Sequence, residues 1–215
     1  MHIKKLLPIL ILFVSIQACA GEQTTDTATS SKPKKSLDDY SVAYFASGCF
    51  WCVEAVFEAV TGVEEVISGY SGGEASDANY DKVSRGLTNH AEAVAIYYDP
   101  KLISYETLLV VFFDSHDPTT LNRQGPDAGR QYRSAIYYMN QEEKSKAKNY
   151  MEELLTNNTF STITTELVEF EAFYEAEDYH QDYKKKNPNN GYIRAVSNPR
   201  FEAFAAKHPT LLKKK

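Results

Sequence analysis

Two cysteines, Cys49 and Cys52, form the clearest chemical signal in this chain of 215 residues. They lie in residues 47–54, which read Ser-Gly-Cys-Phe-Trp-Cys-Val-Glu. The thiolate is the reactive form of cysteine, and paired thiols exchange with disulfides through thiolate attack. The spacing therefore predicts nucleophilic or redox chemistry of sulfur at this point of the chain.

The segments on either side predict how Cys49 is positioned. Residues 41–46 are apolar and aromatic enough for a buried strand. The apolar residues after the pair have the spacing of one helix face: Val53, Val56, Phe57 and Val60. We therefore expect Cys49 at a strand-to-helix turn, where free N–H groups and the helix dipole stabilise an anion. The sequence predicts that this thiol has a lowered pKa and is partly thiolate at neutral pH.

The remaining cysteine and the histidines do not indicate a metal site. The chain has three cysteines, and the third, Cys19, lies far from the pair. A zinc site with four cysteine ligands is therefore excluded. The histidines His90, His116 and His180 lack tight metal-ligand spacing, so we interpret them as hydrogen-bonding residues of the framework. We expect no bound metal.

The first residues are typical of an export signal, because Lys4 and Lys5 precede the apolar stretch 6–16. That stretch is too short to span a bilayer as a helix and fits a signal peptide over residues 1–18. Residues 15–19, Ser-Ile-Gln-Ala-Cys, resemble a bacterial lipoprotein processing box, which implies that Cys19 becomes the lipidated N-terminal residue. An ordinary secretory signal, with this cysteine incidental, is the alternative.

Residues 19–39 are rich in Thr, Ser and Lys and show no periodicity, so they predict a lipidated cysteine followed by a flexible tether. We expect an exported lipoprotein, anchored in a membrane and facing the periplasm or the cell exterior. Residues 40–207 have the size of one domain, and 208–215 form a C-terminal tail. Strand and helix patterns alternate in the domain, which favours an α+β or α/β sandwich. A net charge of −6 argues against a nucleic-acid partner.

Five further segments, taken in order, carry residue patterns that occur together in one family. The segments are 48–51, 69–73 with 79–80, 90–94, 116–118 with 124–134, and 176–181 with 186–188. Over nearly all of residues 41–207 they resemble peptide methionine sulfoxide reductase, A class (the MsrA family). The resemblance implies a two-layer α/β sandwich of the α+β class, built on a ferredoxin-like core. It also implies that the protein uses no metal or organic cofactor.

The resemblance implies a role for each matched side chain. Cys49 would be the nucleophile, and Phe50 with Trp51 would form an apolar box for the S-methyl group of the substrate. The residues that would surround the sulfoxide oxygen are Tyr80, Glu92 and Tyr132, with Asp127 completing the polar network. The family further implies the S epimer of methionine sulfoxide, free or in proteins, as the substrate.

The chemistry of sulfoxide reduction requires a nucleophile and a proton donor of these kinds, whatever the family. It needs a soft nucleophile at sulfur, which a thiolate supplies, and a proton for the departing oxygen. Glu92 lies between alanines in an apolar strand, so burial would raise its pKa and keep it protonated. The cysteine would leave the reaction as a sulfenic acid. Glu92 as a paired structural acid and Asp127 as a backbone cap are the alternatives, and Tyr80 and Tyr132 taken singly would be surface or core residues.

Cys52 departs from the commonest family pattern, which has glycine there and resolving cysteines near the C-terminus. This chain has no cysteine after Cys52. We therefore predict a Cys49–Cys52 disulfide that a thioredoxin-like partner reduces. A buried filler role for Cys52, with an outside thiol resolving Cys49, is the alternative.

Two other functions compete with the reductase reading. A thioredoxin-type thiol–disulfide oxidoreductase would also use two such cysteines at a helix start, but Trp51 lies between the cysteines and not before the first. A surface-anchored binding lipoprotein with an aromatic pocket would not need the Cys49 thiol. We expect the reductase, acting as a monomer in the repair of oxidised proteins.

Overall fold

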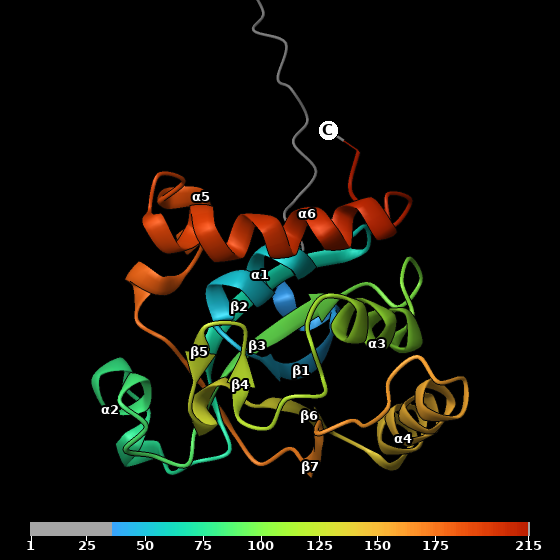
Figure 1. The fold of residues 1–215 in the computed structure, drawn as a ribbon, viewed down its shortest axis with the longest axis horizontal. Coiled ribbons are helices and arrows are strands. Elements are labelled where there is room, and N and C mark those ends of the chain that lie inside the picture. The colour runs from blue at the N-terminus through green and yellow to red at the C-terminus, as the bar shows by residue number, and fades with distance from the viewer. Residues whose placement is uncertain (1–35, 215) are drawn as a thin grey trace, which may run out of the picture. The chain divides into compact units, whose positions relative to one another are not determined.

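The computed structural model of the protein describes residues 36–214 (Figure 1). Within this range, no helix combines the length and apolar character needed to cross a bilayer. The expected signal peptide, Cys19 and the tether up to residue 35 lie outside the described residues.

One layer of the domain is a six-stranded sheet in the order β7-β6-β1-β3-β2-β8. Neighbouring strands are antiparallel except β6 and β7, which are parallel. The strands are β1 (Ser41–Ser47), β2 (Val63–Ser71), β3 (Ala91–Tyr98), β6 (Ser134–Tyr138), β7 (Glu166–Glu169) and β8 (Phe173–Glu175). A small hairpin pairs β4 (Arg123–Gln124) with β5 (Asp127–Ala128).

Helices connect and cover these strands (Figure 1). They are α1 (Phe50–Glu58), α2 (Tyr80–Ser84), α3 (Tyr105–Asp114), α4 (Gln141–Thr156), α5 (Tyr183–Lys186) and α6 (Asn198–Lys207). The chain runs β1-α1-β2-β3-α3-β6, and each helix crossover spans one intervening strand of the order β6-β1-β3-β2. This is the predicted ferredoxin-like core of an α+β fold.

The central strand β3 is buried along nearly its whole length. Alternate side chains point to opposite faces, so Val94 and Ile96 share one face with Glu92. That face packs on aromatic residues of β1, α1 and α3, namely Phe45, Phe57 and Phe112. Each fully buried phenylalanine contributes about 1.5–3 kcal/mol. Because this face is otherwise apolar, Glu92 is held in a water-poor interior.

Two segments differ from what their local sequence predicts. The glycines of residues 69–73 predict a loop, but Gly69–Ser71 continue β2 and pair with both β3 and β8. A Cβ on Gly69 would lie 2.3 Å from the Phe173 ring, so the glycine serves close strand packing. The sequence near 176–186 predicts a helix, but the structure has a 3-10 turn (Asp178–His180) followed by α5.

The break before α5 lies at Asp182, which has a φ of 55°. Its N–H donates a hydrogen bond of 3.0 Å to Glu54 Oε1 on α1. Lys185 adds contacts of 2.7 Å to Glu58 and 2.8 Å to Asp182. The Glu54 side chain is buried, and burial raises its pKa to about 8. A neutral buried carboxyl group therefore joins α1 to the C-terminal segment.

The chain beyond α6 packs back onto the domain. Val60 and Leu212 form an isolated antiparallel bridge. The Thr61 N–H donates to the Leu211 carbonyl at 2.8 Å, and the Lys213 N–H donates to the Ala59 carbonyl at 2.8 Å. The predicted C-terminal tail thus adds hydrogen bonds at the end of α1.

We predict that Glu54→Gln removes part of the loss of stability that occurs as the pH rises from 4.5 to about 8. The ordinary pKa is 4.5, and the folded value is about 8. Between these values the unfolded chain releases a proton that the folded chain keeps, so the free energy of unfolding falls by up to about 1.4 kcal/mol per pH unit. Glutamine keeps the acceptor for Asp182 without titrating. Denaturant unfolding at a series of pH values measures this, with the exposed Glu171→Gln as control. An unchanged slope in Glu54→Gln would contradict the assignment.

Candidate active site

Cys49 caps the N-terminus of α1 directly after β1, as the sequence predicts. Gly48 makes this turn with a φ of 88°, a conformation that L side chains rarely adopt. A Cβ there would also lie 2.6 Å from the side chain of Gln124 in the β4–β5 hairpin. The glycine therefore lets the hairpin close against the turn. The Cys49 carbonyl accepts from the Cys52 N–H at 3.0 Å, which places both cysteines in the first turn of the helix.

The predicted side chains converge on one cavity of about 140 Å³. It is lined by Cys49, Phe50, Trp51, Tyr80, Glu92, Asp127, Tyr132 and Tyr192. These residues come from α1, α2, β3, the β4–β5 hairpin, the 3-10 turn Arg130–Tyr132 and the C-terminal segment. Cys52 does not line the cavity and is only 1% exposed.

Glu92 projects from β3 toward the start of α1 and is 2% exposed. Its Oε2 accepts a 3.0 Å hydrogen bond from the Phe50 N–H. Burial raises the pKa of this carboxyl group to about 8, and the charges of Asp127 and Cys52 act in the same direction. The backbone hydrogen bond offsets only part of the rise. Glu92 is therefore a neutral acid at pH 7, with Oε1 left to carry the proton.

The predicted lowered pKa of the Cys49 thiol is wrong for the substrate-free protein. Burial raises its pKa well above the ordinary value, helped by its hydrogen bond with Cys52 and by Glu92. The first N–H of the helix is already used by Glu92, and the Trp51 N–H alone opposes the rise. The hydrogen bond from Cys49 instead lowers the pKa of Cys52 to about 6 against its own burial. The thiolate of the pair thus lies on Cys52.

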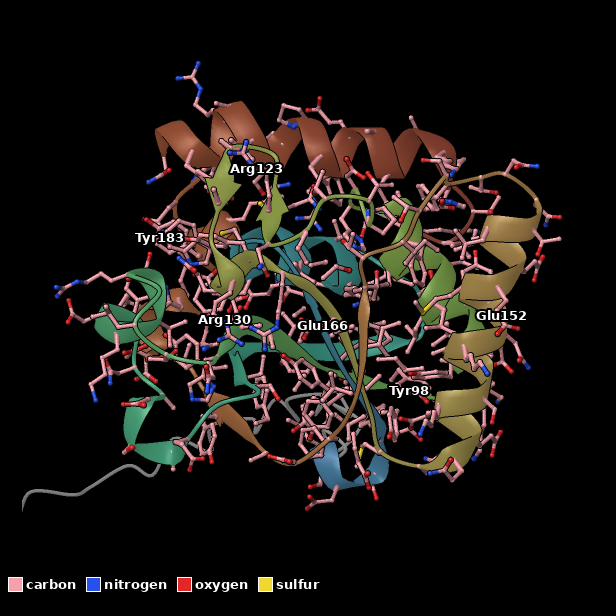
Figure 2. The ribbon with its side chains drawn as sticks, turned by 60° about the horizontal axis from the view of Figure 1, so that its bottom comes forward. Tyr98, Arg123, Arg130, Glu152, Glu166 and Tyr183 are labelled. Atoms are coloured by element: carbon pink, nitrogen blue, oxygen red, sulfur yellow. The ribbon has the colours of Figure 1, made fainter. Side chains whose placement is uncertain are left out.

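The aromatic wall is held from behind by the C-terminal segment. The Trp51 ring stacks on Tyr183 of α5, with ring centroids 3.7 Å apart and planes at 7°. Tyr183 is labelled in Figure 2. Trp51 Nε1 donates a 3.0 Å hydrogen bond to His180 Nδ1. Phe50 and Tyr80 lie nearly parallel, with centroids 6.4 Å apart. The indole is therefore fixed in position beside the cavity.

Glu177 links three parts of the chain behind this wall. It accepts from the Tyr70 hydroxyl at 2.8 Å and from the Tyr80 N–H at 2.9 Å. His180 Nε2 lies 3.9 Å from the same carboxylate. Burial lowers the pKa of His180, so a neutral ring can accept from Trp51 at Nδ1 and point its own N–H toward Glu177. The expectation that His180 is a hydrogen-bonding framework residue is confirmed.

Tyr192 is the lining residue that sequence reasoning missed. Its hydroxyl donates a short hydrogen bond to Asp127 Oδ2 and lies 4.0 Å from Cys52 Sγ. It follows the turn 187–191 in a segment without periodicity, so its sequence position gave no pattern to detect. Burial raises the pKa of Tyr80 to about 12, and it also raises the pKa of Tyr132 and of Tyr192. All three hydroxyls are therefore neutral hydrogen-bond donors.

Within residues 36–214, no group of three or more His, Cys, Asp or Glu side chains could hold a metal ion. His116 is tied to the framework, with its ring nitrogens 2.7 Å from the Phe112 carbonyl and 2.8 Å from Ser134 Oγ. A buried thiol, a neutral carboxyl group and aromatic rings around one small cavity define a thiol-based oxidoreductase site.

Comparisons with known proteins specify the family. A family model described as peptide methionine sulfoxide reductase matches residues 41–211. MsrA 1 of Rhodopirellula baltica is 52% identical over 170 residues, which cover 79% of this chain and 88% of the relative. Reduced Mxr1 from Saccharomyces cerevisiae has a TM-score of 0.67 at 34% identity, covering 71% of this chain and 88% of Mxr1. Mxr1 in a complex with Trx2 has a TM-score of 0.50 at 24% identity, and the match covers 71% of this chain and 90% of the Mxr1 chain. At this identity the match shows the common fold alone.

The chain therefore belongs to the peptide methionine sulfoxide reductase family, as its motifs indicated. Its activity is the reduction of methionine sulfoxide to methionine. The matched range, residues 41–211, contains every residue that lines the cavity.

We predict that Glu92→Gln slows methionine sulfoxide reduction roughly 10²-fold, the usual loss for a general acid. In the unmodified protein the rate should fall as the pH rises through about 8, because Glu92 then loses its proton. Glutamine does not titrate, so this alkaline fall should disappear. Profiles of kcat/KM against pH measure both effects, with the exposed Glu171→Gln as control. An alkaline fall that persists in Glu92→Gln would assign it to another group.

Proposed function

We propose that the cavity reduces the S epimer of methionine sulfoxide, free or in proteins, with Cys49 as the nucleophile. One observation supports this most strongly: a thiol, a neutral carboxyl group and an aromatic wall line the same cavity of about 140 Å³. A cavity this small suits a single sulfoxide with its methyl group and excludes bulk water. The protein thereby repairs methionine residues after oxidation.

The substrate methyl group packs against Phe50 and Trp51, whose ring faces favour its partial positive charge. The sulfoxide oxygen then faces Glu92 and the hydroxyls of Tyr80 and Tyr132. Such donors stabilise the charge that develops on this oxygen. Asp127 orients the Tyr192 hydroxyl at the same side of the cavity.

Cys49 becomes reactive by passing its proton along the existing hydrogen bond to the Cys52 thiolate. The Cys49 thiolate attacks the sulfoxide sulfur while Glu92 protonates the departing oxygen. The net reaction moves one oxygen atom from the substrate sulfur to Cys49. It releases methionine and leaves a sulfenic acid on the enzyme.

Cys52 resolves the sulfenic acid. Cys52 Sγ attacks Cys49 Sγ, the S–O bond of the sulfenic acid breaks, and the proton that Cys52 accepted earlier passes to the departing hydroxyl, so that a Cys49–Cys52 disulfide forms and the oxygen leaves as water. The pairing is supported by the position of both residues in the first turn of α1. A thioredoxin-like dithiol donor then reduces the disulfide; the similar protein Mxr1 is known in complex with Trx2. No metal or organic cofactor takes part, and the protein acts as a monomer.

We predict that residues 38–215 turn over the S epimer and not the R epimer with dithiothreitol as the reductant. Cys49→Ser should abolish turnover, because a serine hydroxyl is a poor nucleophile toward sulfur. Cys52→Ser should still release about one methionine per enzyme in a single turnover, but it should lose cycling driven by thioredoxin. Chromatographic separation of the epimers and a thioredoxin-coupled assay measure these outcomes.

A result against the reductase assignment would be turnover of neither epimer together with reduction of insulin disulfides. That outcome would favour a thioredoxin-type oxidoreductase. Function that survived Cys49→Ser would favour a binding lipoprotein. Full thioredoxin-driven cycling in Cys52→Ser would instead point to an outside thiol as the resolving group.

We further propose that the protein is exported and anchored in a membrane through lipid on Cys19. The support is the sequence pattern: a basic start, the apolar stretch 6–16 and the processing box at 15–19. Residues 1–18 would be removed, and residues 19–39 would tether the domain formed by 40–207. The C-terminal tail would be 208–215.

We predict that Cys19→Ala moves the protein from the membrane fraction to the soluble fraction or leaves it unprocessed. Mass spectrometry of the unmodified protein should find an acylated cysteine at its N-terminus. Reductase activity of the Cys19→Ala protein should be unchanged, since residue 19 precedes the family match. An unacylated N-terminus at residue 19 or 21 would support an ordinary secretory signal.

A further inference from the structure

Helix α1 contacts the C-terminal segment through α5, the turn at residues 193–197 and α6. A π-helical turn, Ile193–Ser197, leads directly into α6 there. Such π turns are rare and often occur at functional sites. Tyr192 places its hydroxyl 4.0 Å from Cys52 Sγ, and the buried Ser197 hydroxyl also faces this sulfur. One continuous segment thus surrounds Cys52.

Arg200 of α6 brings a positive charge to the same place. Its Nε donates to the Ser115 carbonyl at 2.5 Å, and its Nη2 donates to Ser47 Oγ at 3.2 Å. Nη1 lies 3.6 Å from the position that a Cβ on Gly48 would occupy. Both acceptors are neutral oxygens, so they fix the guanidinium without cancelling its charge. The cation is therefore held beside the turn that carries both cysteines.

The two sulfurs differ in their access to an incoming molecule. Cys49 lines the cavity and is 7% exposed, whereas Cys52 is 1% exposed and does not line it. A thiol that enters the cavity therefore meets Cys49 first. In thiol–disulfide exchange the attacked sulfur is retained in the mixed disulfide, and the other sulfur must leave as a thiolate.

We propose that Arg200 and Ser197 form a thiolate-holding site for Cys52, so that the reducing thiol attacks Cys49 Sγ and Cys52 is the leaving group. This proposal rests on the proposed function, in which Cys49 and Cys52 form a disulfide. The donor thiolate bonds to Cys49 Sγ while the Cys49–Cys52 bond breaks, and the electron pair goes to Cys52. The second thiol of the donor then displaces Cys49 and completes the two-electron reduction.

The electrostatics of the site agree with this assignment. The pKa of Cys52 is lowered to about 6 by the hydrogen bond from Cys49, against burial, with further lowering by Arg200, Ser197 and Tyr192. Thiols of lower pKa leave faster. The other charged or titratable groups that act on Cys52 are Glu92 on β3 and Lys184 on α5. Arg200 is thus a positioning residue for the charge and does not touch the substrate.

The test compares Arg200→Met with Arg200→Lys in the full-length protein. Met removes the charge at similar length, and Lys restores it. Arg194→Met is the matched control, because Arg194 belongs to the same segment but is exposed. The chain has one tryptophan, Trp51, between the two cysteines. Its fluorescence in stopped flow follows formation of the disulfide after mixing with methionine sulfoxide, and its reduction by thioredoxin or dithiothreitol.

Loss of the charge should raise the pH midpoint of disulfide formation by about one unit. Below that midpoint the Cys49–Cys52 disulfide should form about threefold more slowly in the variant. About tenfold less Cys52 is then ionised, and the greater nucleophilicity of the more basic thiolate offsets part of this loss. Reduction of the oxidised enzyme should be slower at every pH, since a worse leaving group departs. Arg200→Lys should recover most of both effects. Ser197→Ala should change the pH midpoint and the reduction rate in the same directions, but by less. This variant tests the proposal even if Arg200→Met does not fold.

An unchanged pH midpoint or an unchanged reduction rate in both Arg200→Met and Ser197→Ala would overturn the proposal. A second measurement locates the attacked sulfur. Protein oxidised with diamide is mixed with excess glutathione, quenched in acid, alkylated and mapped by mass spectrometry. Glutathione on Cys49 is expected, and glutathione on Cys52 would overturn the proposal. If methionine sulfoxide produced no Cys49–Cys52 disulfide in the unmodified protein, the proposed resolving step itself would fail, and the role of this site with it.

Discussion

The hydrogen bond from the Phe50 N–H to Glu92 is the contact on which the site depends. It joins the central strand to the first turn of the helix that carries both cysteines. A buried carboxyl group needs a partner, and a helix start needs an acceptor for its free N–H groups. Each satisfies the other, and the result is a protonated acid fixed beside Cys49. Burial raises the pKa of the Cys49 thiol, the hydrogen bond with Cys52 and the charge of Glu92 add to the rise, and the Phe50 N–H that Glu92 occupies cannot oppose it.

The C-terminal segment completes what α1 begins. Tyr183 and His180 hold the indole of Trp51, and Tyr192 links Asp127 to the region of Cys52. The segment is attached to α1 through the neutral Glu54 and to α2 through Glu177. Much of the site is therefore built from a part of the chain more than 100 residues away from the cysteines, as the Glu54–Asp182 contact illustrates with a separation of 128.

Local patterns predicted the framework well. The strand before Cys49 and the helix after it lie where the sequence places them. The period of apolar residues is a local property, so a single segment reveals it. The strand β8 and the break at Asp182 were missed. Both depend on pairing or hydrogen bonding with distant segments, and no short window contains that information.

The sequence by itself determined the family, the fold and the residues that line the cavity apart from Tyr192, because ordered motifs record them. It could not determine the ionisation of those residues. The raised pKa of Glu92 was predicted from its apolar strand, but the predicted lowering of the Cys49 pKa was wrong, and the lowered pKa of Cys52 was not predicted. Burial, competition for one helix N–H and the approach of Arg200 decide which sulfur holds the charge. All three effects depend on contacts between segments far apart in the chain, and only the tertiary structure sets those contacts.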